Sequence, residues 1–189
     1  RFKAWWTRII PAAAERPTFV LATCICLGLM YWQWRPMTDV VWSVDHAVGS
    51  SLLNALCWVG WGTVLISTFL INHFDLFGLR QPWLAFKGVE DVPGPFVTRG
   101  LYKVVRHPLM LGFLIAFWAT PHMTAGHLLF SCLTTGHIFL AVHLLEERDL
   151  MKFFPVEYAK YRRTTPSILP IPRFLRPGAE DTARARTNG

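Results

Sequence analysis

The stretch that decides the fold is residues 107–147, HPLMLGFLIAFWATPHMTAGHLLFSCLTTGHIFLAVHLLEE. It holds two apolar runs, 109–119 and 128–145, joined by a short link that contains Pro121. The second run ends at two adjacent carboxylates. Because Pro interrupts a helix and both runs are almost wholly apolar, the pattern predicts a tight helical hairpin that passes through a membrane.

Two further apolar runs, at residues 19–34 and 52–71, precede the hairpin. A helix rises about 1.5 Å per residue, so roughly 20 residues cross the apolar core of a bilayer. We therefore predict an all-α fold, a multi-span transmembrane helical bundle, in one domain over residues 1–176 with a disordered tail over 177–189. The four predicted spans are residues 18–34, 51–72, 107–120 and 127–146.

The composition fits a membrane protein and excludes other classes. The chain is 52% hydrophobic and 16% charged, whereas a soluble domain carries about a quarter charged residues. Its net charge of +7 comes from Lys and Arg placed between the apolar runs and not on one face, which argues against nucleic-acid binding. The four cysteines lie inside apolar runs without a zinc or redox spacing, so no metal site and no disulfide is predicted.

The basic residues also predict the orientation of the spans. They cluster before the first span, between the second and third, and after the fourth. Arg35 stands alone between the first two spans, and residues 120–127 hold no Lys or Arg. By the positive-inside rule, segments 72–108 and 148–176 both face the cytoplasm, and we expect a cofactor pocket where they meet.

The first of these segments ends in the sequence VTRGLYKVVRHPLMLG, residues 97–112. Pro108 is predicted to begin the third span, because its missing N–H has no partner in a first helical turn. The positive end of that helix lies beside Arg106 and His107 and suits a ligand carboxylate. The hairpin returns the carboxylates at 146–147 to the same face. On the residues alone, a binding pocket and a solvated rim of interfacial charges both stay open.

The order of these motifs resembles the isoprenylcysteine carboxyl methyltransferase family over about residues 95–170. The pattern V-T-x-G-x-Y-x-x-x-R-H-P-x-x-x-G is followed by a hairpin, by E-E, and then by F-x-x-E-Y-x-x-Y-x-x-x-x-P-x-x-L-P. The resemblance implies that S-adenosylmethionine binds in a pocket formed by this region. The chain also lacks the Gly-rich fingerprint of a Rossmann domain.

Carried over residue by residue, the resemblance implies cofactor contacts at Phe96, Val97, Tyr102, His107, Pro108, Leu109, Met110, Glu146 and Glu147. The family usually has Tyr at the position of Met110, so one contact would be missing or supplied elsewhere. Prenylcysteine methyltransferases carry a carboxylate-binding Arg at the position aligned with Thr164, although Arg163 lies next to it. Loss of that Arg favours an acceptor other than a prenylcysteine carboxylate.

Residues 67–81, 118–121 and 126–130 are similar to one branch of this family, the NnrU-like methanethiol S-methyltransferases. The branch implies methyl transfer from S-adenosylmethionine to a small thiol, methanethiol giving dimethyl sulfide, at the bacterial inner membrane. Its members have one or two spans before the position of residues 2–9. We therefore expect N-terminal spans to be missing from this sequence.

Methyl transfer to sulfur requires a thiolate, so the site must accept a proton. His73 is the predicted base, oriented by Asp75 or Asn72, because His titrates near neutral pH. The alternative is that His73 only makes interfacial hydrogen bonds.

Three other functions stay open. A prenylcysteine or phospholipid methyltransferase would need a wide lipid-facing groove. A relative of the sterol reductases would use NADPH and need further basic residues in a longer chain. A non-catalytic NnrU-like membrane subunit would bind no cofactor. The predicted partners are a small-molecule thiol and the lipid bilayer, with no nucleic acid and no obligate protein partner.

Overall fold

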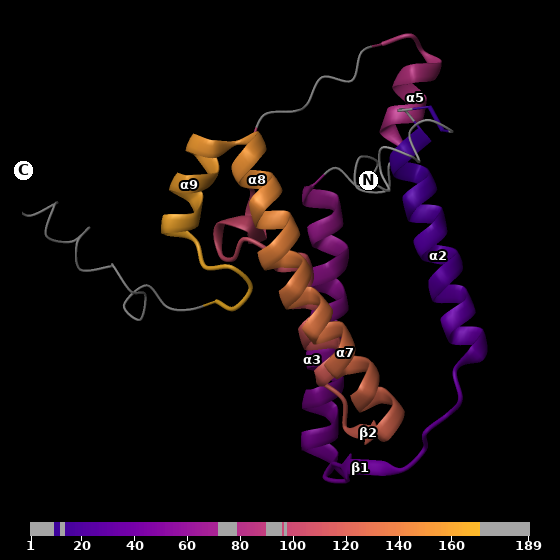
Figure 1. The fold of residues 1–189 in the computed structure, drawn as a ribbon. Coiled ribbons are helices and arrows are strands. Elements are labelled where there is room, and N and C mark those ends of the chain that lie inside the picture. Colours follow the sequence, from indigo (N-terminus) through magenta and orange to yellow (C-terminus); the bar gives the residue numbers. More distant parts are fainter. Residues whose placement is uncertain (1–9, 12–13, 72–78, 90–95, 97, 171–189) are drawn as a thin grey trace, which may run out of the picture.

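A computed structural model describes residues 10–11, 14–71, 79–89, 96 and 98–170. Within them the elements are α2 (Glu15–Gln33), β1 (Val40–Ser43), α3 (Ala47–Leu70), α5 (Arg80–Phe86), the 3₁₀ turn η2 (Gly100–Lys103), α6 (Pro108–Trp118), β2 (His122–Thr124), α7 (Ala125–Ala141), the π-helical turn η3 (Val142–Glu146), α8 (Glu147–Phe153) and α9 (Pro155–Thr164). Helices α3, α6 and α7 form a column, from which α2 stands apart (Figure 1). The strand pair lies at one end of the column, and α8 and α9 lie at the other.

The close approach of α3 and α6 is the tightest packing in the column. A Cβ atom built on Gly60 would lie 2.6 Å from the backbone nitrogen of Ala116, and one on Gly112 would lie 2.8 Å from the carbonyl oxygen of Gly60. Only residues without a side chain allow two helix backbones to come this near. Gly112 and Ala116, four residues apart on α6, thus form the small-residue face on which α3 rests.

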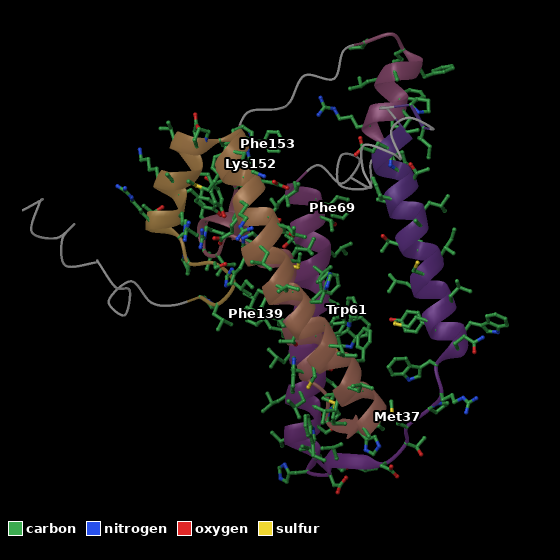
Figure 2. All side chains as sticks on the ribbon, in the orientation of Figure 1. Met37, Trp61, Phe69, Phe139, Lys152 and Phe153 are labelled. Carbon is green, nitrogen blue, oxygen red and sulfur yellow. The ribbon has the colours of Figure 1, made fainter. Side chains whose placement is uncertain are left out.

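Helices α7 and α8 join through η3 into one helix, Ala125–Phe153, of 29 residues. At about 1.5 Å per residue it is about 43 Å long, so it exceeds the roughly 30 Å apolar core of a bilayer by more than two turns. Figure 2 shows Lys152 and Phe153 at the end of this helix, and Phe69 of α3 at the same end of the column. The carboxylates at 146–147 lie near that end.

The all-α prediction is confirmed in its main part, with one correction at the far end of the column. Strands β1 and β2 pair antiparallel, with an irregular register between Val40 and Trp42. The link of the predicted hairpin is therefore part of a two-stranded ribbon. Beside the ribbon, the first N–H groups of α7 find acceptors in the segment before β1: Ala125 donates to the carbonyl of Asp39 at 2.8 Å, and Gly126 donates to that of Met37 at 3.1 Å.

Each of the four predicted spans falls on an apolar helix, but the helices differ in length. Ala47–Leu70 and Ala125–Phe153 are long and apolar enough to cross a membrane, whereas Pro17–Gln33 and Pro108–Trp118 are shorter. Large apolar side chains on α3, such as Trp58 and Phe69, are exposed. Exposed apolar surface of this extent is typical of a protein that contacts lipid or further helices. A four-span topology stays a prediction.

Candidate functional site

The site is built on the segment that connects η2 to α6. Gly100 has a φ of +53°, a value that favours glycine, and the turn that it starts rests against Leu70 at the end of α3. Pro108 is the first residue of α6, as predicted, with His107 at the N-cap. The Arg106–His107 pair therefore lies at the positive end of α6.

Two carboxylates approach this pair from the long helix. Arg106 Nη2 lies 2.9 Å from Glu147 Oε1, and His107 Nδ1 lies 3.0 Å from Glu146 Oε2. His107 Nε2 is 3.7 Å from Glu147 Oε1, beyond hydrogen-bonding distance. The side chains of Arg106 and His107 are 8% and 6% exposed. The Arg106–Glu147 contact is a buried, charge-assisted pair, whereas Glu146 is 41% exposed.

The segment after α9 closes the site from the other side. The backbone N–H of Arg106 donates to the carbonyls of Pro166 and Ser167, at 2.8 and 2.9 Å, and that of His107 donates to Ser167 at 3.0 Å. Ser167 also donates its hydroxyl to Glu147 Oε1 at 3.2 Å. One short segment thus fixes both the backbone of the Arg–His pair and the carboxylate that faces it.

Two tyrosines of α9 support the same segment. Tyr158 is fully buried, and its hydroxyl accepts a hydrogen bond from Arg106 Nη1 at 3.4 Å. The hydroxyl of Tyr161 donates to the carbonyl of Tyr102 and, at 3.5 Å, to that of Val105. Burial raises the pKa of Tyr161 to about 12 and raises the pKa values of Tyr102 and Tyr158 as well. All three phenols are therefore neutral hydrogen-bonding groups at physiological pH.

Three buried polar side-chain atoms in the described part of the chain lack a hydrogen-bond partner: Tyr102 Oη, Arg106 Nε and His107 Nε2. All three belong to this one segment. Native proteins rarely leave buried polar groups unpaired, because each costs about 1–3 kcal/mol. Their grouping indicates a site where a polar ligand supplies the missing partners. The donor set suits a carboxylate together with neutral hydroxyl or amine groups.

The structure brings together four of the predicted site residues: Tyr102, His107, Glu146 and Glu147. Pro108 is buried at the start of α6 beside them. Asn72, His73, Asp75 and Val97 lie outside the described residues.

The other predicted contacts lie in apolar surroundings. Phe96 packs its ring against Phe154 and Tyr161, at centroid distances of 5.4 and 5.5 Å. Leu109 is partly buried in α6. Met110 packs against the apolar cluster that contains Ile138. Their contact with a cofactor stays a prediction.

Three residues of the site were absent from the predicted set: Arg106, Tyr158 and Ser167. Arg106 could have been predicted as a site residue, since it is part of the R-H-P motif. Tyr158 belongs to the closing motif, but nothing in its spacing indicated an Arg partner. Ser167 acts through its backbone carbonyl as well as its hydroxyl, and a backbone contact leaves no trace in residue type.

Comparison with known proteins gives the relatives of this chain. It is 53% identical to a methanethiol S-methyltransferase of Mycobacterium tuberculosis, over 90% of this chain and 70% of the relative. It is 46% identical to a methanethiol S-methyltransferase of Pseudomonas deceptionensis, over 95% of this chain and 68% of the relative. It is 47% identical to methanethiol S-methyltransferase 2 of Bradyrhizobium diazoefficiens, over 100% of this chain and 71% of the relative. No family model and no solved structure matches.

Proposed function

Because the chain belongs to the methanethiol S-methyltransferase family, we propose that it transfers the methyl group of S-adenosylmethionine to methanethiol, giving dimethyl sulfide. The observation that carries the cofactor assignment is the trio of unpartnered buried atoms on Tyr102, Arg106 and His107. When bound, S-adenosylmethionine supplies an activated methyl group on a sulfonium centre. Its amino-acid part offers a carboxylate and an ammonium, which match this set of donors and nearby carboxylates.

Different residues of the site suit different chemical groups of the cofactor. Arg106, with His107 and the positive end of α6, provides donors for a carboxylate. Glu146 keeps 41% of its side chain exposed while it pairs with His107, so it can also accept from an ammonium or a ribose hydroxyl. The neutral hydroxyl of Tyr102 can donate or accept. These roles need no Rossmann domain.

The protein must also help the thiol to lose its proton, since the thiolate is the reacting form. We keep His73 as the proposed base, oriented by Asp75 or Asn72. The prediction rests on residue type and on its place after α3. A His73→Ala variant should lose methyl transfer while it still binds S-adenosylhomocysteine.

The proposed reaction takes place at a membrane. The two long apolar helices and the exposed apolar side chains of α3 support an integral membrane protein. The Lys and Arg residues on either side of the hairpin support a cofactor site on the cytoplasmic face, in bacteria the inner face of the inner membrane. Methanethiol is small and apolar and can reach such a site through lipid, and no further partner is required.

The test uses detergent-purified protein. S-adenosylhomocysteine is titrated by calorimetry, and dimethyl sulfide is measured by headspace gas chromatography after addition of S-adenosylmethionine and methanethiol. Binding and product formation by the parent chain, both lost in His107→Ala, are the expected results. Folded protein that binds no S-adenosylhomocysteine would refute the methyltransferase proposal. Binding without dimethyl sulfide, with methylation of another thiol or of a lipid, would refute the proposed acceptor.

A further inference from the structure

We propose that Glu147 is a positioning residue that acts on the cofactor through Arg106 and does not contact it. This inference rests on the methyltransferase function proposed above. It modifies the sequence prediction, in which Glu146 and Glu147 joined the cofactor contacts together. Three observations carry it: the π-helical turn, the partners of the Glu147 carboxylate, and the way in which the Arg106 side chain is held.

The π-helical turn η3 determines which carboxylate faces inward. Before Glu147 the buried positions of the long helix are Gly126, Ser131, Ile138 and Val142, and the last three lie at the seven- and four-residue spacings of one α-helical face. The next buried residue is Glu147, five positions after Val142, and its N–H bonds to the Val142 carbonyl. Leu145, which an α-helix would place closer to this face, is 63% exposed. Such turns recur at functional sites, and this one places Glu147 on the inner face.

One oxygen of the Glu147 carboxylate is hydrogen-bonded to protein groups. Its Oε1 accepts from Arg106 Nη2 at 2.9 Å and from the Ser167 hydroxyl at 3.2 Å. Its Oε2 lies 3.9 Å from Arg162 Nε, and the side chain is only 11% exposed. Glu146, one residue earlier, is far more exposed. Oε1 of Glu147 is therefore occupied by protein donors, and the low exposure of the side chain limits the access of a ligand to Oε2.

The guanidinium of Arg106 is fixed at both of its ends. Glu147 binds Nη2, and the Tyr158 hydroxyl binds Nη1, with the ring of Tyr158 centred 5.8 Å from the guanidinium carbon. Nε is left buried and without a partner. Because the guanidinium is a rigid planar fork, fixing Nη1 and Nη2 also fixes the direction of Nε–H. Glu147 thus sets the direction of the Nε–H donor that Arg106 presents to a ligand.

The test is a double-mutant cycle on the full chain in detergent, with S-adenosylhomocysteine binding measured by calorimetry. Glu147→Gln should weaken binding about 10- to 100-fold, as expected for loss of a buried charged hydrogen bond. In an Arg106→Gln background the same change should weaken binding by no more than about 2-fold more, because the guanidinium that Glu147 holds is absent. Equal losses in both backgrounds would show direct contact and overturn the proposal.

Glu146→Gln is the matched control, since Glu146 is adjacent but pairs with His107. Glu146→Gln should weaken S-adenosylhomocysteine binding by the same factor in the parent chain and in the Arg106→Gln variant. A second readout uses 5′-methylthioadenosine, which lacks the amino-acid part. Glu147→Gln should spare its binding, whereas equal weakening of both ligands would indicate a general structural defect and overturn the proposal.

Ser167→Ala provides a second test in case the Glu147→Gln protein does not fold. It removes one of the two hydrogen bonds to Oε1 and leaves the backbone contacts in place. It should weaken S-adenosylhomocysteine binding about 5-fold, the size of one hydrogen bond, and have no effect with Arg106→Gln. An undiminished effect in that background would overturn the proposal. Failure of the parent chain to bind would instead refute the proposed function.

Discussion

Gly60→Ala tests the packing that holds α6 and its N-terminal site in place. The added methyl would lie 2.6 Å from the backbone nitrogen of Ala116 and 2.9 Å from the Gly112 carbonyl oxygen. Ordinary contacts of a methyl group are near 3.5–4.0 Å. The clash is with backbone, so no side chain can rotate away and the two helices must separate by about 1 Å.

The expected loss of stability follows from two opposing terms. Overpacking costs about 1–3 kcal/mol, and replacing a helix-interior Gly by Ala returns about 0.5–1 kcal/mol. The difference is a net loss of about 1 kcal/mol, within a range of about 0–2.5 kcal/mol, and should lower the unfolding midpoint by about 2–4 °C for a chain of this size. The measurement is thermal unfolding in detergent followed by tryptophan fluorescence.

Gly62→Ala is the matched control on the same helix. A Cβ at Gly62 meets nothing within 4 Å among the described residues, so this change should raise the unfolding midpoint by about 1–4 °C. The two substitutions should therefore have opposite signs. If both raise the midpoint, α3 and α6 are not in contact at Gly60, and the packing argument is refuted.

Three further predictions concern the site itself. Tyr161→Phe removes the hydroxyl that holds η2 and should weaken S-adenosylhomocysteine binding about 5-fold by calorimetry; unchanged affinity would contradict a supporting role. Because the pKa of Tyr161 in the folded protein, about 12, lies above the ordinary tyrosine value of 10.0, its stabilising contribution is full below pH 10 and is lost as pH rises toward 12. Unfolding midpoints measured from pH 9 to 12 should fall less steeply in Tyr161→Phe, and parallel curves would argue against this shift. Deleting Leu144 should convert η3 to α-helix while Glu147 stays inward, four residues after Val142, and so retain binding. Inserting Ala after Leu144 should turn Glu147 away by about 100° and abolish binding; the reverse outcome would show that the π-helical turn does not determine which residue faces inward.

Much of the fold could be predicted because a bilayer imposes simple rules. Apolar runs of sufficient length indicated the helices, and Pro108 indicated the first residue of α6. The hairpin then required that Tyr102 and His107 meet the carboxylates at 146–147. Resemblance to a family supplied the proposed cofactor, which spacing alone could not.

The remaining features depend on geometry that residue types do not encode. Phase along an α-helix would place Glu146 inward four residues after Val142, and only the π-helical turn moves Glu147 there. The acceptors from Pro166 and Ser167 are backbone carbonyls, which every residue carries. The β1–β2 ribbon is held by backbone hydrogen bonds between short strands, and the apolar pattern of the sequence does not indicate them.

The hydrogen bonds from Arg106 and His107 to Pro166 and Ser167 join the middle of the chain to a segment synthesised much later. Since a ribosome delivers a protein from its N-terminus, Arg106 and His107 emerge about 60 residues ahead of these partners. Their backbone N–H groups lack the two carbonyls until the segment after α9 has emerged. The site is therefore completed late in synthesis, and a product that ends before Pro166 should lack these backbone contacts.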